Sequence, residues 1–312
     1  MSDWKNIILP KYEVRKTQEQ KNSFIEMLRE TYGEKMRVEE SGKSDKSRNI
    51  VFGNPERAKT VFTAHYDTAV YMPLPNFVTP MNLFVYIIYQ LLLVALIYLP
   101  LVLMIVVASQ LTLGLSDTIR IAVNEIILFA YLIAFLLYMR KGPANRHTAN
   151  DNTSGIVTVL TLLDKLGCDG EYAFILFDNE ELGMRGSKAY AAAHPNVKSS
   201  KLIINLDCVS DGDNILLYPS KIVKNDSFWK NIVGHAENVF AEQGKVLLVP
   251  KGFAFYPSDQ TSFKRNIAVA ALKKSKVVGY YMDRIHTHRD TEFDQKNIDA
   301  LVNLFADCGV NE

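Results

Sequence analysis

Two long apolar runs interrupt a chain whose other hydrophobic residues recur at helix or strand spacing. Residues 82–108 carry no charged side chain, and residues 119–139 form a second run of similar length. A helix needs about 20 apolar residues to cross the hydrocarbon core, so each run is long enough to span a bilayer. Pro100 is expected to kink the first run, because proline removes a backbone donor. The pattern predicts a transmembrane helical hairpin over residues 79–141, inserted between residues 1–78 and 142–312 of one globular domain.

A buried helical hairpin in a soluble core is the alternative interpretation of these runs. It is disfavoured because no helical face of either run is polar. Asn124 and Glu125 lie inside the second run. An ionisable group at membrane depth is a functional candidate, but Glu125 lies less than two turns from the polar loop and can equally reach the interface or cap that loop. The sequence leaves both roles open.

Outside the two runs, patterns typical of strands and helices alternate along the chain. Strands are predicted at residues 48–52, 59–64, 171–177, 202–206, 246–249 and 267–272, and helices at 18–32, 154–166, 187–193, 228–243 and 293–305. The turn signal G-N-P-E, residues 53–56, joins the first two strands. This alternation favours an α/β fold with helices on both faces of the sheet, in which sites form at the carboxyl ends of the strands.

The overall composition restricts the class of partner and the compartment. The chain has 35 basic and 34 acidic residues and a net charge of +1, which gives no electrostatic reason to expect a nucleic-acid partner. The first residues lack the long apolar core of a secretory signal. Cys168, Cys208 and Cys308 are widely spaced and odd in number. They fit neither a disulfide framework nor a C-x-x-C zinc site, and they indicate a reducing compartment.

Five short motifs carry metal-binding side chains and follow predicted strands or precede predicted helices. They are T-A-H-Y-D-T (63–68), A-N-D-N-T-S-G (149–155), F-D-N-E-E-L-G-M-R-G-S (177–187), I-N-L-D-C (204–208) and R-I-H-T-H-R-D-T (284–291). Each motif alone is weak, since an aspartate after a strand often only caps a helix. Together they supply histidines and carboxylates that suit a pair of zinc ions bridged by one carboxylate. Hydrolysis also needs a base that is not a ligand, and Glu180, next to Glu181, can fill that role.

The ordered set H-x-D, N-D-N-x-S-G, E-E-x-G-x-x-G-S, L-D and H-T-x-x-D-T resembles the metallopeptidase family of the two-zinc bacterial aminopeptidases, glutamate carboxypeptidase and glutaminyl cyclase. The resemblance covers nearly all of the soluble part. It implies a zinc-exopeptidase-like fold with a mixed, mostly parallel sheet, and two zinc ions per chain. It also implies the roles of individual residues: Asp151 bridges the ions, His65 and Asp207 hold one, Glu181 and His286 hold the other, Glu180 is the catalytic base, and Asp67 orients His65 from behind.

The resemblance carries further implications at the edges of the site. It implies a cis peptide bond between Asp151 and Asn152. The segment Y-P-S-D-Q-T-S-F, residues 256–263, resembles the family's S-D-H-x-x-F, but Gln260 stands where the family has a histidine. Tyr256 is a candidate for polarising the substrate carbonyl.

Two histidines compete for one ligand position near the end of the chain. His286 and His288 flank Thr287, and the family spacing H-T-x-x-D-T selects His286. Asp290 and Thr291 are expected to begin the last helix.

The position of the hairpin constrains its topology. If His65 and Asp151 bind the same zinc ion, the chain must cross the membrane an even number of times between them, and two spans satisfy this. Arg140, Lys141 and Arg146 follow the second span, whereas residues 108–118 contain no basic side chain. Across the membrane from the domain, only Arg120 lies near the loop between the spans. Residues 70–81, before the first span, add no basic residue. The excess of basic residues after the second span predicts a cytoplasmic catalytic domain.

The predicted function is that of a membrane-anchored zinc exopeptidase, an aminopeptidase that hydrolyses N-terminal residues of peptides through a metal-bridging water. A glutaminyl-cyclase-like acyltransferase is an alternative, but that branch resembles a one-zinc version, and the retained His65 speaks against it. A catalytically inactive membrane scaffold is disfavoured because all the ligand positions and the base are retained. A carboxypeptidase stays open, because the specificity pocket cannot be read from the sequence. The oligomeric state is not indicated.

Overall fold

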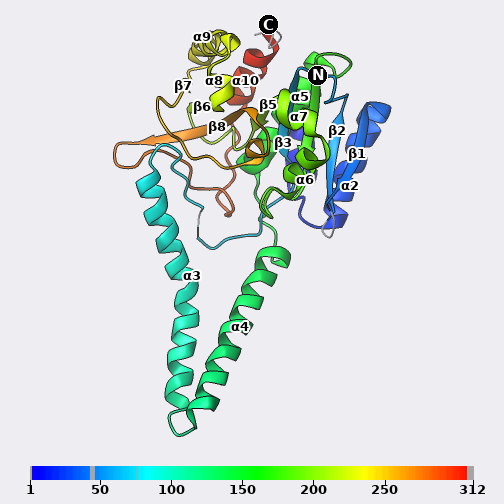
Figure 1. Ribbon diagram of the computed structural model, residues 1–312. Helices are drawn as coiled ribbons and strands as arrows, with labels where there is room; N and C mark the ends of the chain where they lie inside the picture. The colour runs from blue at the N-terminus through cyan, green and yellow to red at the C-terminus, as the bar shows by residue number, and fades with distance from the viewer. Residues whose placement is uncertain (1, 43–45, 75, 308–312) are drawn as a thin grey trace.

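A nine-stranded mixed sheet forms the centre of the domain, in the order β1-β2-β4-β3-β5-β8-β6-β7, with β9 paired to β8. The computed structural model describes residues 2–42, 46–74 and 76–307, and Figure 1 shows their arrangement. The strands are β1 (Met36–Ser41), β2 (Ser47–Phe52), β3 (Thr60–His65), β4 (Tyr172–Phe177), β5 (Leu202–Leu206), β6 (Asn214–Pro219), β7 (Val246–Leu248), β8 (Arg265–Ser275) and β9 (Gly279–Tyr281). Strands β4, β3, β5 and β8 run parallel, and antiparallel pairs flank them. The expected mixed α/β sheet is confirmed.

Helices cover both faces of this sheet. They are α1 (Trp4–Tyr12), α2 (Gln18–Tyr32), α5 (Gly155–Leu166), α6 (Arg185–Ala193), α7 (Pro195–Ser200), α8 (Lys221–Lys224), α9 (Ser227–Glu242) and α10 (Gln295–Asp307). Phe62 on β3 packs into the core that includes α1, α2, α5, α9 and α10, whereas its neighbour Val61 packs into the core that includes α6 and α7. Because successive strand residues point to opposite faces, a strand that is apolar throughout must be covered on both sides.

Several elements were not predicted from the sequence, and each has a physical reason. Strand β1, M-R-V-E-E-S, is an edge strand with partly exposed charged residues, so it lacks a hydrophobic run. Helix α1 contains Pro10, which the pattern reads as a helix breaker. The apolar part of β6 is too short to identify by periodicity. The G-N-P-E turn does not close a hairpin, because β2 pairs with β1 and β4 rather than with β3.

Two long helices project from the domain, as Figure 1 shows. Helix α3 (Leu83–Leu111), which contains Pro100, and helix α4 (Asp117–Lys141) are both long and apolar enough to cross a membrane. In their most apolar windows only 11% and 0% of the residues are buried, so the helices do not belong to the protein core. The Asn124 side chain donates to the Ser109 hydroxyl at 3.2 Å and links the two helices.

The stems of this hairpin are attached to the domain near the carboxyl end of β3. Val70 forms an isolated bridge with Ala144, and Val78 forms another with Met282. The chain leaves the domain after His65 and returns before Asp151. Of the cysteines, Cys168 and Cys208 are free and buried, and Cys308 lies outside the described residues.

Candidate metal centre

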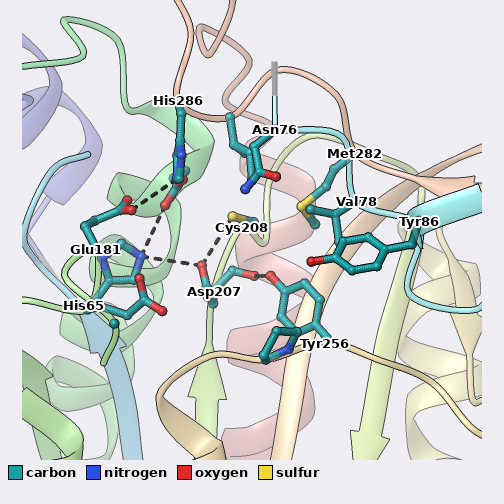
Figure 2. A pocket seen from close by; sticks show the side chains of 15 residues that line it. His65, Asn76, Val78, Tyr86, Glu181, Asp207, Cys208, Tyr256, Met282 and His286 are labelled. Carbon is teal, nitrogen blue, oxygen red and sulfur yellow. Dashed lines mark hydrogen bonds and ion pairs between the residues drawn. The ribbon is translucent and has the colours of Figure 1, made fainter. Parts of the chain in front are cut away.

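The site residues converge at the carboxyl ends of the parallel strands, where an α/β sheet is expected to place them. His65 ends β3, the loop after β4 carries Glu180 and Glu181, and Asp207 follows β5 directly. Asp151 lies in the turn η2 (Ala149–Ser154) that leads into α5, and the backbone of this turn is not helical at Asp151 and Asn152. Figure 2 shows His65, Glu181, Asp207 and His286 pointing toward one another from separate elements.

The cluster divides into two groups that share Asp151. His65 Nε2 lies 3.1 Å from Asp151 Oδ1 and 3.6 Å from Asp207 Oδ1. His286 Nε2 lies 3.1 Å from Asp151 Oδ2 and 3.1 Å from Glu181 Oε2. Asp151 therefore presents one carboxylate oxygen to each histidine, which is the arrangement of a bridging ligand.

Two further observations show that this cluster fits a metal ion. In each group the potential ligand atoms lie within 4.8 Å of one another, and they are the nitrogen and oxygen donors that zinc takes. Glu181 Oε1 is buried and has no hydrogen-bond partner, although a buried polar atom normally has one. Glu180 also lies within this distance of His65 and Glu181, but Glu181 is the residue that forms the ion pair with His286.

The backbone of the Asp151 turn is held by Asp290, which corrects the expectation that Asp290 begins the last helix. Helix α10 begins only at Gln295. The buried Asp290 carboxylate instead accepts hydrogen bonds from the backbone N–H groups of Asn150 and Asp151, at 2.8 and 3.0 Å. The peptide bond between Asp151 and Asn152 is cis, as the resemblance implies. Asp290 thus fixes the segment that carries the shared carboxylate.

Asp67 lies behind His65 and organises two elements at once. Its backbone carbonyl oxygen is 3.2 Å from His65 Nδ1, and its carboxylate is 3.6 Å from the same atom. The two carboxylate oxygens accept the backbone N–H groups of Glu180 and Glu181, at 2.9 and 3.2 Å. Through these contacts Asp67 sets the position of the Glu180–Glu181 loop relative to β3.

Burial and the concentration of carboxylates shift the pKa values in the cluster. Burial alone lowers the pKa of His65, but hydrogen bonds with the surrounding aspartates outweigh it and raise the pKa well above its ordinary value. Burial raises the pKa of the Asp151 carboxyl, yet hydrogen bonds from His286 and His65 bring it below its ordinary value. Burial raises the pKa of Glu180 well above its ordinary value, and the charge of Glu181 adds to this. A cation is the natural compensation for so many buried carboxylates.

The cluster opens into a cavity of about 250 Å³. Tyr256 lines the cavity, and its hydroxyl donates to the Asp207 backbone carbonyl at 3.0 Å. Gln260 lies behind Tyr256: its amide donates to the Tyr256 carbonyl at 2.6 Å and accepts from Asn205 at 3.0 Å. Among the described residues, His286 belongs to the cluster, whereas His288 lines a separate cavity.

Asp290 and Tyr86 are among the site residues that sequence reasoning missed. Asp290 lies within a motif that was recognised, but its role depends on a contact with a distant turn. Tyr86, on the first turn of α3, lines the cavity. An apolar run carries no signal that distinguishes the residue facing a cavity from its neighbours, so Tyr86 could not be identified from the pattern.

Known proteins support the same fold and family. Residues 136–307, more than half of the chain, match the model of peptidase family M28. No curated protein matches the chain. A Zn-dependent exopeptidase from Parabacteroides distasonis is similar with a TM-score of 0.56 at 14% identity, over 99% of this chain and 96% of that one.

Two further solved structures have TM-scores of 0.54. The LapA aminopeptidase of Legionella pneumophila is 12% identical over 99% of this chain and 68% of its own. The glutaminyl cyclase of Porphyromonas gingivalis is 14% identical over 98% of this chain and 94% of its own. At such identities the likeness shows a zinc-exopeptidase-like fold and does not distinguish a peptidase from a cyclase. The match over residues 136–307 shows the family: the chain belongs to peptidase family M28.

Proposed function

We propose that this chain is a membrane-anchored, zinc-dependent aminopeptidase with two metal ions in its active site. The observation that carries the proposal is the shared position of Asp151, with one carboxylate oxygen 3.1 Å from His65 and the other 3.1 Å from His286. A cyclase with one zinc ion, or an inactive scaffold, has no need of two such groups joined by one carboxylate.

The proposed ligands follow from these two groups. One ion is held by His65, Asp151 and Asp207, and the other by Asp151, Glu181 and His286. Zinc, when bound there, supplies Lewis acidity and makes water a stronger acid near neutral pH. Asp67 and Asp290 position the ligands from behind, and such outer contacts typically change metal affinity 10–100-fold when removed.

Glu180 is the proposed general base. It takes a proton from the attacking water and returns it to the leaving nitrogen of the cleaved peptide bond. Its backbone N–H is fixed by Asp67, and its side chain lines the cavity next to His65 and Glu181. Tyr256 also lines the cavity, and it is proposed to contact the substrate carbonyl.

The side chains that line the cavity favour an amino terminus over a carboxyl terminus. The described residues that line the cavity include several carboxylates of the metal cluster. None of these lining residues is a lysine or an arginine. With the proposed zinc ions bound, the charge of these carboxylates is balanced. A carboxypeptidase is disfavoured because no lysine or arginine among the described lining residues can pair with a C-terminal carboxylate. Lys16 and Arg140 line a smaller cavity beyond Glu181 and His286, and a carboxypeptidase would have to use these cations.

The hairpin over residues 79–141 is the proposed membrane anchor, and the bilayer is its partner. This is supported by the exposed apolar side chains of α3 and α4, which lipid would cover. Arg140 and Lys141 end α4 on the side of the domain, and this excess of basic residues supports the proposal that the domain lies in the cytoplasm. The net charge of +1 provides no electrostatic attraction for a nucleic acid.

Purified full-length protein in detergent, loaded with zinc, tests the proposed activity. The peptide Leu-Gly-Gly-Phe, its N-acetylated form and its C-terminal amide are incubated with the protein, and the products are identified by mass spectrometry. The free and amidated peptides should lose leucine, and the acetylated peptide should stay intact. Loss of phenylalanine from the acetylated peptide would indicate a carboxypeptidase, and ring closure of the N-terminal glutamine in a fourth peptide, Gln-Gly-Gly-Phe, would indicate a cyclase. A fully loaded protein that acts on none of these is a scaffold.

A further inference from the structure

The first turn of the proposed membrane helix forms part of the active-site cavity. Tyr86 lies one turn into α3 and lines the same cavity as His65 and Asp151. Figure 2 shows its ring across the cavity from the metal-binding cluster, with the hydroxyl pointing inward. The helix that leaves for the bilayer therefore contacts the space where a substrate binds.

Apart from the Tyr86 hydroxyl and the amide of Asn76, which also lines the cavity, this wall is apolar, in contrast to the side that carries the metal-binding cluster. Tyr86 is joined there by Val78, Met282 and Ile285. Figure 2 shows Val78, Met282 and Tyr86 grouped on one side and the histidines and carboxylates on the other. A peptide whose reacting carbonyl lies at the cluster must place a neighbouring side chain against this apolar surface.

The position of Tyr86 is fixed by several contacts with the domain. Its ring packs against Phe255 at a centroid distance of 5.4 Å. The Asn82 side chain accepts from Val85 N–H at 3.2 Å, which caps α3, and its amide donates to the Val278 carbonyl at 3.2 Å. The start of α3 is thus held to the strands that carry the cavity, and the ring cannot move away without breaking these contacts.

Val78 and Met282 are fixed in the same way. The two residues exchange backbone hydrogen bonds of 3.0 Å in both directions. The apolar wall is therefore preformed, as in most small-molecule pockets. A preformed wall can discriminate between side chains by size.

We infer that this apolar wall receives the side chain of the substrate's N-terminal residue, and that Tyr86 sets the largest side chain accepted. The inference rests on the proposed aminopeptidase function and names its substrate class: peptides that begin with an apolar residue of intermediate size. The hairpin is then part of the specificity pocket as well as an anchor.

The test compares substitutions that enlarge and reduce the pocket. Full-length wild type, Tyr86→Ala, Tyr86→Trp and Tyr86→Phe are assayed in detergent on Ala-Gly-Gly, Leu-Gly-Gly and Trp-Gly-Gly. In an apolar pocket a difference of one methylene changes kcat/KM by about 10–200-fold. Tyr86→Ala should therefore raise the Trp-to-Leu ratio of kcat/KM by about tenfold or more. Tyr86→Trp should lower the Leu-to-Ala ratio by a similar factor, and Tyr86→Phe, which keeps the ring, should preserve both ratios.

Tyr89→Ala is the matched control. Tyr89 lies on the same helix and packs against Phe77 at 5.3 Å, but among the described residues it does not line the cavity. Its removal loosens the contact between helix and domain without changing the pocket, so both ratios should stay at their wild-type values. Equal shifts in Tyr86→Ala and Tyr89→Ala, or unchanged ratios in both pocket-size variants, would overturn the inference.

Calorimetry of free L-leucine and L-tryptophan separates this inference from the proposed activity. Leucine should bind the zinc-loaded wild type more tightly than tryptophan, and Tyr86→Ala should reverse the order. If the wild type cleaves no peptide, the aminopeptidase proposal fails, while the binding series still decides the role of Tyr86. If peptides are cleaved but neither the binding order nor the cleavage ratios respond to Tyr86, only the inference fails.

Discussion

Phenylalanine has opposite environments in the two parts of this chain. Phe62 in the centre of the sheet is 0% exposed, whereas Phe84 at the start of α3 is 73% exposed. Inside the domain, apolar side chains are covered by helices on both faces of the sheet. On the hairpin the described neighbours leave most of them open. The comparison separates an apolar interior from an apolar surface, and the proposed membrane anchor would place that surface in lipid.

The two regions meet at the proposed metal centre. The stems of the hairpin leave and enter the domain next to His65 and Asp151, and Tyr86 reaches into the cavity. The domain supplies the charged half of the site, and the hairpin contributes to the apolar half. An insertion that looks like a mere anchor in the sequence is therefore placed where it can affect catalysis.

Substitutions in the carboxylate cluster of the domain are expected to have the largest effect on the rate of peptide hydrolysis. Glu180→Gln should reduce the rate by about 10²–10⁴-fold, because it removes the proton acceptor, while zinc content stays near that of the wild type. Glu181→Gln is the neighbouring control and should lose both activity and zinc, because it removes a ligand. Peptide hydrolysis and metal analysis on the same samples check both. Substantial activity in Glu180→Gln would show that another group is the base.

Matched truncations test the difference in burial directly. Phe62→Ala should lower the free energy of unfolding by about 3–5 kcal/mol, as core phenylalanines do. Phe84→Ala in the hairpin should change it by less than about 0.5 kcal/mol, because the site is outside the domain core. Guanidinium unfolding in detergent, followed by the fluorescence of Trp4 and Trp229, reports on the domain, since both tryptophans are buried there. If both substitutions lowered the free energy of unfolding equally, the hairpin would pack as part of the core.

A charged residue in the middle of α3 tests whether this helix lies in lipid or in water. Leu96→Arg should disfavour membrane insertion by about 2.5–3.5 kcal/mol, the cost of arginine at the centre of a span. Leu113→Arg, in the loop between α3 and α4, should have little effect. Resistance of the protein to carbonate extraction from membranes measures both. If neither substitution changes the extraction, the hairpin is not embedded in the bilayer.

The orientation of the hairpin can be examined by cysteine labelling, which requires no measurement of activity. Single cysteines are placed at Ser116 and Lys198 in a variant without Cys168, Cys208 and Cys308, and intact cells are treated with an impermeant thiol reagent. Ser116→Cys should be labelled in intact cells, and Lys198→Cys only after the cells are opened. The reverse pattern would place the catalytic domain outside the cell.

The sequence predicts best what depends on local pattern or motif order. Strands β4 and β5 were found because burial on both faces makes them apolar throughout, and the motif order brought out the residues from His65 to His286. Contacts between segments that are distant in the chain could not be predicted from the sequence. The pairing of β2 with β4, the hold of Asp290 on the Asp151 turn and the approach of Tyr86 to the cavity all join segments that are distant in sequence. No local periodicity records them.

The zinc content of the purified protein tests the central claim most directly. Full-length protein is prepared without chelator, reloaded with zinc, freed of excess metal and analysed by mass spectrometry of the intact complex. The shared carboxylate of Asp151 predicts saturation at two ions per chain, and Asp151→Ala should retain fewer than two because it removes a ligand from both positions. Saturation of the wild type at a single ion would contradict the two-metal site and favour a one-zinc, cyclase-like enzyme.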